Sequence, residues 1–226
     1  MSENHCIHVI ARIRSDFGSK FGVPRQSGLV DALEAAVVFE EPYRNPDALR
    51  GLEGFSHIWL IWAFHQSQRP EWSPTVRPPR LGGNQRVGVF ASRSPFRPNP
   101  IGLSSVRLDH IAYTDALGPV LHVRGADLVD GTPILDIKPY LPYGDCHPEA
   151  GGFASEPARP TLEVEIPPAL LDQLPPDRRE ALRDVLALDP RPRYQQDPDR
   201  VYGFLFAGQE VRFTVDGDRL QVVDIK

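Results

Sequence analysis

The chain lacks the features that mark several common protein classes. Its longest apolar run, Ile58 to Phe64, has seven residues, whereas a helix that crosses a bilayer needs about 20. The N-terminus has no basic region followed by an apolar core, so we expect no signal peptide and no membrane segment. Only two cysteines, Cys6 and Cys146, occur in 226 residues, which is typical of a reduced, cytoplasmic protein.

The usual nucleotide and metal motifs are missing too. No G-x-G-x-x-G follows a predicted strand, and no G-x-x-x-x-G-K-[ST] is present. Strands and helices do not alternate, so a Rossmann-type fold is disfavoured. Segments 5–8 (HCIH) and 145–147 (DCH) do not have the spacing of structural zinc sites, and neighbouring residues on a strand point to opposite faces. We therefore expect no metal.

Charge is negative overall but positive in one strip. The formal net charge is −5 at pH 7, which argues against a general nucleic-acid coat protein. Between Trp72 and Leu108, however, the chain has six arginines and no acidic residue. Such a strip is compatible with local phosphate contacts, although the same arginines can also be spread over a solvated surface.

Short strands separated by glycine and proline fill the first two thirds of the chain. This pattern, with almost no helix, predicts a mainly β protein built as a barrel or a sandwich. A loop is expected over 15–28, and one helical turn over 46–52 with Asn45 as its cap. The strands are expected at 6–14, 35–39, 56–64, 86–91, 103–113, 120–124 and 133–137.

A shift to small and polar residues between Gly144 and Arg159 predicts a domain boundary. It divides the chain into an N-terminal domain, 1–145, and a small α+β C-terminal domain, 160–226. In the second domain, Leu182, Val185 and Leu186 lie on one face of a predicted helix, and Asp216-Gly217 is the turn of a predicted hairpin. Strands are expected at 161–166 and 201–206, the helix at 176–188 and the hairpin at 209–225.

The most informative segment is Ser92–Leu103, with the sequence SRSPFRPNPIGL. Its three prolines remove backbone donors and restrain φ, so it forms neither a helix nor a central strand. It nevertheless carries two arginines, two serines and an asparagine. A rigid loop with so many hydrogen-bonding groups is suited to a small charged ligand. Arg93 can hold a carboxylate with two hydrogen bonds, and Asn99 can either bind a ligand or close its own turn.

This loop and three further segments resemble the signature of the tsaA-like family of tRNA methyltransferases. The further segments are 20–26 (KFGVPRQ), 52–57 (LEGFSH) leading to 64–66 (FHQ), and 127–133 (DLVDGTP) leading to 136–140 (DIKPY). The resemblance implies an N-terminal β-barrel that binds S-adenosylmethionine. It also implies the reaction, which is methylation of N6 of threonylcarbamoyladenosine at position 37, next to the anticodon of tRNA. Family members are expected to be homodimers, with the cofactor site near the subunit contact.

The resemblance implies a set of cofactor-binding residues. Arg93 would hold the methionine carboxylate, Leu103 would pack on the adenine or ribose, and acidic residues would bind ribose hydroxyls or the amino group. His65 and Gln66 have a plain alternative as caps of the sheet, and Asp130 as part of an ordinary Asp-Gly turn. The whole set is Pro24, Arg25, Gln26, His65, Gln66, Arg93, Leu103, Asp127, Leu128, Val129 and Asp130.

Asp136, Lys138 and Tyr140 alternate along an extended segment and share a face, either as a surface ladder or as the reactive face. The implied substrate nitrogen is a poor nucleophile because its lone pair is delocalised, but its N–H is comparatively acidic. We expect Asp136 to take this proton, with help from Tyr140, and Arg97 or Lys138 to bind the threonyl carboxylate. Phe96 or Tyr140 would stack on the base. The catalytic candidates are thus Asp136, Tyr140 and Lys138, and the substrate-binding candidates are Arg97, Phe96 and Asn99.

Two rival classes stay open at this point. One is a β module that captures a nucleoside or S-adenosylmethionine without chemistry, as a sensor. The other is a protein-interaction domain that presents polyproline II segments such as 77–80 (RPPR). A methylation assay separates the first rival from an enzyme, and a saturable cofactor titration argues against the second.

Overall fold

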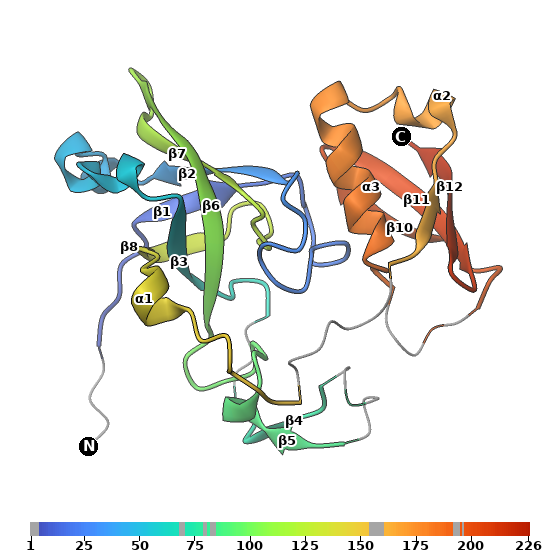
Figure 1. The fold of residues 1–226 in the computed structure, drawn as a ribbon, viewed down its shortest axis with the longest axis horizontal. Helices are drawn as coiled ribbons and strands as arrows, with labels where there is room; N and C mark the ends of the chain where they lie inside the picture. Colours follow the sequence, from blue (N-terminus) through green and yellow to red (C-terminus); the bar gives the residue numbers. More distant parts are fainter. Residues whose placement is uncertain are drawn as a thin grey trace.

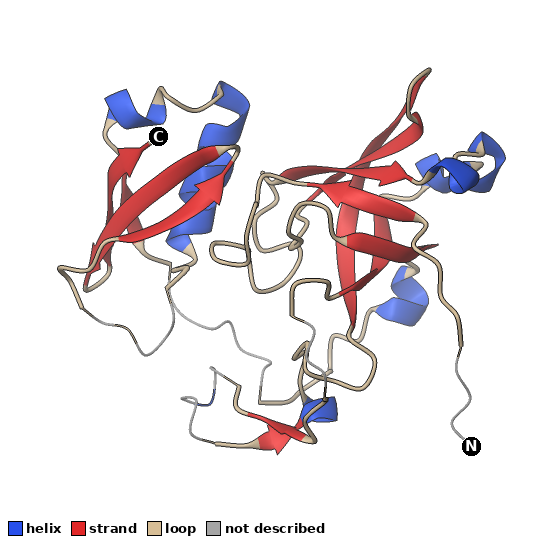
Figure 2. Ribbon diagram, turned by 180° about the vertical axis from the view of Figure 1, so that it is seen from behind, coloured by secondary structure: helices blue, strands red, loops and turns tan. Residues whose placement is uncertain are grey.

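The structure is a computed structural model that describes residues 5–67, 71–78, 81, 85–153, 161–191, 195 and 197–226. Strands are the main regular secondary structure (Figure 2), and most of them form two β-rich units that lie side by side in Figure 1. The mainly β class that the sequence predicts is confirmed, and so is the combination of an N-terminal barrel with a small α+β unit.

Six strands close into the N-terminal barrel. Their order is β1-β2-β7-β6-β3-β8, and β8 pairs with β1 to complete the circle. Side chains alternate between the interior and the surface, so that Ala11 and Ile13 of β1 are fully buried. The barrel strands are β1 (Ala11–Arg14), β2 (Glu34–Phe39), β3 (His57–Ala63), β6 (Ile101–Thr114), β7 (Gly118–Arg124) and β8 (Pro133–Pro139).

The barrel interior is a single apolar cluster. Closure leaves the barrel strands with no unpaired edge, and the inward residues of all six fill the space between them. Its fully buried members include Ile13, Val37, Ile58, Leu60, Leu121 and Ile134. The predicted helical turn is also confirmed. Pro46–Leu49 form a 3₁₀ turn, and the Asn45 side chain accepts a hydrogen bond from the Asp47 backbone at 3.0 Å.

Two predicted strands are wrong in extent. The first begins at Ala11, and not at residue 6. The Ile10 backbone still bonds to Ile134 and Glu40, but residues 5–8 are exposed and are not buried against the barrel. The predicted strand 86–91 ends after two residues, because Val89–Ala91 turn into a 3₁₀ helix. There Val89 is buried, and the Ser92 hydroxyl donates to its carbonyl at 2.8 Å.

A small hairpin, β4 (Thr75–Val76) with β5 (Val87–Gly88), extends from the barrel at the bottom of Figure 1. The proline-rich segment 77–80, interpreted as a candidate polyproline II ligand, is described only at residues 77 and 78, and residues 79 and 80 lie outside the described part of the chain. A single helical turn, α1 (Pro142–Asp145), follows β8.

The C-terminal unit is a four-stranded sheet covered by one helix. Its order is β10-β11-β12-β9, and only β9 runs parallel to its neighbour. The predicted helix is confirmed as a 3₁₀ turn, Pro176–Arg178, that leads into α3, and its face of Leu182, Val185 and Leu186 is buried. The predicted Asp216-Gly217 hairpin is confirmed as well. The elements are β9 (Glu163–Glu165), α2 (Pro168–Leu171), α3 (Arg179–Ala187), β10 (Tyr202–Phe206), β11 (Gln209–Asp216) and β12 (Arg219–Ile225).

Candidate functional site

A cavity of about 540 Å³ lies where four segments of the N-terminal unit meet. They are a loop after β1, the end of β3 with the residues that follow it, the loop that leads into β6, and the segment between β7 and β8. These are parts of the four segments singled out in the sequence. The cavity is lined by Lys20, Val23, Pro24, Arg25, Gln26, Trp62, Phe64, His65, Gln66, Ser67, Arg93, Arg97, Asn99, Ile101, Gly102, Leu103, Asp127, Leu128, Val129 and Thr132.

Serine hydroxyls brace the proline-rich loop at the cavity wall. Ser92 Oγ accepts from the Ser94 backbone N–H at 3.3 Å, and Ser94 Oγ accepts from that of Phe96 at 3.3 Å. The Arg97 guanidinium donates back to the Ser92 carbonyl at 3.1 Å. With three prolines already restraining φ, these local bonds leave the loop little freedom. The loop therefore presents Arg93 and Asn99 from a stiff backbone.

Cationic side chains dominate the charge of the cavity. Lys20, Arg25, Arg93 and Arg97 line it, together with one carboxylate, Asp127. Two of these cations also join the segments. The Arg93 guanidinium donates to Gln26 Oε1, and the Lys20 ammonium donates to the Gln66 carbonyl oxygen. The Arg93–Gln26 bond fixes the orientation of a guanidinium that is otherwise exposed.

A polar relay connects the cavity to the barrel. Trp62 Nε1 donates to Ser104 Oγ at 3.0 Å, and Ser104 Oγ donates to the Asp127 carboxylate at 2.5 Å. Burial raises the pKa of Asp127, although the Ser104 hydrogen bond and the charge of Arg93 oppose that rise. A carboxylate that is costly to ionise, and that lies beside a cation, is a typical ligand-binding group.

Gly102 makes room for this relay. It pairs with Trp62 across β3 and β6, and a Cβ atom at Gly102 would lie 2.3 Å from the Trp62 indole. Any larger residue would therefore push the indole away from Ser104. His65, which also lines the cavity, is kept neutral. Burial lowers the pKa of its imidazole, and the charges of Arg12 and Lys20 lower it further.

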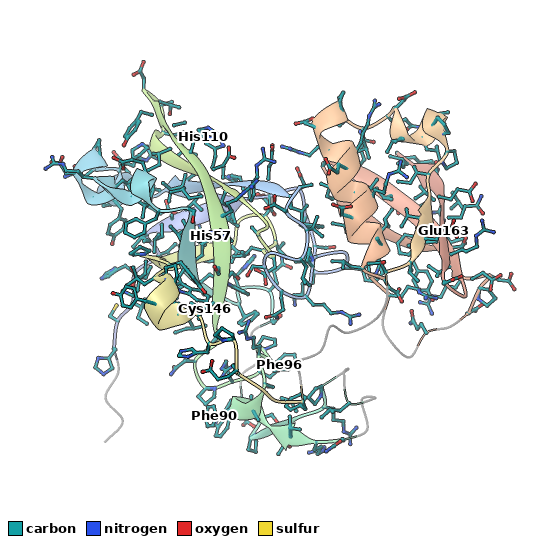
Figure 3. The ribbon with its side chains drawn as sticks, in the orientation of Figure 1. His57, Phe90, Phe96, His110, Cys146 and Glu163 are labelled. Atoms are coloured by element: carbon teal, nitrogen blue, oxygen red, sulfur yellow. The ribbon has the colours of Figure 1, made fainter. Side chains whose placement is uncertain are left out.

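The structure brings most of the predicted cofactor-binding residues together. Of that set only Asp130 does not line the cavity. Its carboxylate accepts from the Ser15 backbone N–H at 3.1 Å and lies 3.6 Å from the Arg14 guanidinium. Of the substrate-binding candidates, Arg97 and Asn99 line the cavity and Phe96 does not. In Figure 3, Phe96 lies between the barrel and the β4–β5 hairpin.

The three catalytic candidates lie outside the cavity, on the outer wall of the barrel. Asp136 and Lys138 share that face, as their alternation predicts, and form an ion pair at 2.8 Å. The ring of Tyr140 packs 5.5 Å from that of Trp59, measured between centroids. Burial, with the nearby Cys146 and Asp145, raises the pKa of Tyr140, so its phenol stays protonated at neutral pH.

Asp136 is nevertheless connected to the cavity by strand register. Ile61 pairs with Leu103 on one side and with Asp136 on the other, and in-register residues of antiparallel strands point to the same face. Leu103, which lines the cavity, is therefore about 10 Å from Asp136 across two strand spacings. The pairing of β3 and β8 is irregular after Ile61, and bulges of this kind often re-aim a side chain beside an active site.

Two residues of the relay, Trp62 and Ser104, and the cavity residue Thr132 were missed by the sequence analysis. Trp62 was interpreted only as part of a buried strand, and Ser104 and Thr132 only as strand or turn residues. The small residues Gly102 and Ser104, which directly follow the proline-rich loop, were the available signal. Among the described residues, no three side chains of His, Cys, Asp or Glu gather as metal ligands would.

None of the helices in the described part of the chain has the length and apolar character that a membrane crossing requires. Cys6 and Cys146 are exposed thiols and form no disulfide.

Comparison with known proteins gives the family. The models of the tRNA-methyltransferase O N-terminal domain and of the TrmO C-terminal domain match residues 12–146 and 159–226. A tRNA (adenine(37)-N6)-methyltransferase of Escherichia coli (strain K12) is 44% identical over an alignment of 216 positions, and the match covers 91% of this chain and 91% of that protein. A Pseudomonas aeruginosa protein, named as a candidate S-adenosylmethionine-dependent methyltransferase, is 39% identical over an alignment of 230 positions, and the match covers 98% of this chain and 97% of that one. A crystal structure of TrmO from Pseudomonas aeruginosa has a TM-score of 0.80 and 33% identity, and covers 99% of this chain and 100% of that chain. This chain therefore belongs to the tRNA-methyltransferase O family.

Proposed function

We propose that this protein methylates N6 of adenine 37 in tRNA and that its cavity binds the methyl donor, S-adenosylmethionine. One observation carries the proposal. Four cationic side chains and one partly buried carboxylate line a cavity of about 540 Å³ that is built from the four segments resembling the family signature. This volume falls within the range of small-ligand sites, about 300–1,000 Å³.

The lining residues fit the chemistry of the donor. Its methionine end carries a carboxylate and an ammonium group, and Arg93 and Asp127 offer the opposite charges. Arg93 is held by Gln26 in a defined orientation, which favours a two-bond contact with a carboxylate. The apolar part of the cavity, at Leu103 and Leu128, suits the adenosine end. When bound, S-adenosylmethionine supplies an electrophilic methyl group.

The acceptor base would lie on the outer wall between the cavity and Asp136. Leu103, Ile61 and Asp136 form one row across β6, β3 and β8, so a base lying over Ile61 reaches both ends of the row. There the Asp136 carboxylate would accept the proton from the N6 amino group. Lys138 forms an ion pair with this carboxylate at 2.8 Å and restrains its orientation. Tyr140, which stays protonated, would donate a hydrogen bond or stack on the base.

The finer substrate that we propose is adenosine that already carries threonylcarbamoyl on N6. A carbonyl on that nitrogen makes its N–H more acidic and brings its proton within reach of a carboxylate base. The threonyl group adds a carboxylate of its own, which Arg97 or Lys138 would bind and which Asn99 would orient. Asp136 would then remove a proton from an N6 nitrogen that is more acidic than that of unmodified adenine.

An exposed aromatic pair supports contact with a tRNA loop. Trp72 and Phe90 are 51% and 75% exposed, and their rings are stacked with centroids 6.4 Å apart. Figure 3 shows Phe90 at the β4–β5 hairpin, away from the barrel core. Both residues lie within the arginine strip that has no acidic residue. Unpaired bases stack on such rings, and nearby arginines bind the phosphates.

We further propose that the protein is a homodimer in the cytoplasm, where its tRNA substrate is found. Ile101 and Leu103 are 37% and 50% exposed beside the cavity, which supports a subunit contact at that edge. We also propose that the chain is divided into two domains, 1–145 and 160–226.

The deciding experiment supplies labelled S-adenosylmethionine and two tRNA preparations, one with and one without threonylcarbamoyl at position 37. We expect label in N6-methylated nucleoside, identified by mass spectrometry, only from the modified tRNA. Label in both preparations would support methyltransferase activity but would contradict the proposal that the substrate must carry threonylcarbamoyl. Saturable donor binding without any methylated nucleoside would instead favour the rival reading of a non-catalytic sensor.

A further inference from the structure

The loop that carries one wall of the cavity is seated in the core of the C-terminal unit. This loop, 15–28, runs from β1 toward β10 and is drawn in blue in Figure 1. Phe17 forms a backbone bridge with Phe206, and the Ala207 backbone N–H donates to the Asp16 carbonyl at 2.9 Å. The Phe17 ring is 1% exposed and packs edge-on against Phe206 with centroids 5.5 Å apart. Phe17 thus belongs to the C-terminal core, although it lies in the N-terminal unit of the sequence.

A second contact lies directly before the cavity residues. The rings of Phe21 and Phe204 pack edge-on with centroids 6.2 Å apart. Gly22 has a φ of +93°, and a Cβ atom there would lie 2.4 Å from the Phe204 ring. The backbone therefore turns against the face of Phe204 at a point where only glycine fits. The next four residues, 23–26, all line the cavity.

A second wall of the cavity, formed by segment 127–132, is attached to the same anchor. The Phe17 carbonyl accepts from the Asp130 backbone N–H at 2.8 Å, and the Ser15 hydroxyl donates to the Leu128 carbonyl at 2.8 Å. Segment 127–132, which includes Asp127, is thereby tied to residues 15–17. One anchored stretch of backbone fixes two walls of the site.

Ion pairs hold the two units together beside this anchor. Arg178, at the start of the helix of the C-terminal unit, lies 3.0 Å from Asp16 and 2.8 Å from Glu34, measured between nitrogen and oxygen. Its side chain is 22% exposed, so these contacts are shielded from solvent more than a surface pair. Asp16 lies next to Phe17, and Glu34 begins β2. Arg178 therefore connects the start of α3 to the start of the loop and to β2.

We propose that the C-terminal unit positions the donor-binding loop, with Phe204 and Arg178 as positioning residues that act through Gly22, Phe17 and Asp16. The proposal rests on the proposed function, because it concerns the same donor site. Loss of the contact would let Lys20 and residues 23–26 move away from Arg93 and Asp127. Donor affinity would fall, while the reactive groups on the outer wall of the barrel would stay in place.

The test compares two variants that each replace a glycine of positive φ by alanine. Gly22→Ala and Gly217→Ala both place a side chain at positive φ, +93° and +58°, but nothing lies within 4 Å of a Cβ at Gly217. We expect Gly22→Ala to raise the dissociation constant of S-adenosylmethionine by at least about fivefold in calorimetry, with kcat at saturating donor changed less than KM. Gly217→Ala should bind as wild type does. In the double variant, Phe204→Leu should restore part of the affinity lost by Gly22→Ala, because the smaller side chain relieves the contact.

A second pair of variants covers the case in which Gly22→Ala does not fold. Arg178→Ala removes the ion pairs to Asp16 and Glu34, and Arg219→Ala removes an exposed pair with Glu163 at 3.4 Å. We expect weaker donor binding from Arg178→Ala alone. Wild type that binds no S-adenosylmethionine contradicts the proposed function itself. If wild type binds S-adenosylmethionine, and folded Gly22→Ala or Arg178→Ala binds it with the same affinity, the positioning role is overturned and the proposed function still stands.

Discussion

Replacing Asp127 by asparagine would separate the stability of this protein from its affinity for the methyl donor. The Asp127 carboxylate accepts the Ser104 hydroxyl at 2.5 Å, and an asparagine side-chain oxygen can accept the same bond. The substitution therefore removes a negative charge and keeps the packing and the relay to Trp62. Burial raises the pKa of Asp127, which means that folding disfavours its ionised form.

Proton linkage fixes the direction of the stability effect. Because the folded state raises this pKa, the contribution of the protonated carboxyl is present at low pH and is lost as the pH rises through the raised pKa. Asparagine does not titrate. At pH 7 we expect Asp127→Asn to unfold at a temperature no lower than wild type, and we expect this difference to move in favour of wild type as the pH falls.

Donor affinity should move the other way. A hydrogen bond to a charged group contributes about 1.5–3 kcal/mol, so its loss should weaken S-adenosylmethionine binding roughly 10- to 100-fold. Calorimetric titration measures the affinity, and thermal denaturation at several pH values measures the stability. The control is Asp130→Asn, because the Asp130 carboxylate faces Ser15 and Arg14 and not the cavity. Unchanged affinity in Asp127→Asn, or an equal loss in Asp130→Asn, would refute the reasoning.

Four further substitutions test the donor site, the base and the tRNA contact. Arg93→Ala should weaken S-adenosylmethionine binding roughly 10- to 100-fold in calorimetry, while Arg86→Ala, on the β4–β5 hairpin, should not; equal effects would remove the special role of Arg93. Asp136→Asn should lower kcat about 10²- to 10⁴-fold with donor affinity unchanged, and a variant with full turnover would exclude Asp136 as the base. Trp72→Ala and Phe90→Ala should each raise the KM for tRNA roughly 5- to 100-fold without changing donor affinity, and an unchanged KM would argue against stacking on this pair.

Much of the fold was predictable because its signals are local. Asn45 and Pro46 start a turn by their own chemistry, Asp216-Gly217 closes a hairpin between adjacent strands, and the apolar face of the C-terminal helix repeats within a few residues. The extent of the strand after Arg86 was not predictable in this way. Val87 and Val89 alternate as in a strand, but Val89 is buried in a 3₁₀ turn that Ser92 caps.

The candidate site was predictable as a set of segments and not as a geometry. Proline and serine content identified the loop around Arg93, because rigidity and hydrogen-bonding capacity are readable from composition. The relay through Trp62 and Ser104 depends on the register of β3 against β6, which no local pattern states. The same holds for Asp130, whose carboxylate turns toward Ser15, 115 residues earlier in the chain. The seating of Phe17 against Phe206 is a contact between the two units and was equally beyond the reach of local signals.

The central claim is that the methyl donor binds between the loop after β1, the proline-braced loop and the segment at Asp127. A crystal structure grown with excess S-adenosylhomocysteine, the demethylated donor, tests it most directly. The account predicts the ligand carboxylate against the Arg93 guanidinium and the Asp127 carboxylate against the ligand's amino or ribose hydroxyl groups. A ligand bound at another place, with these side chains in contact only with solvent, would contradict it.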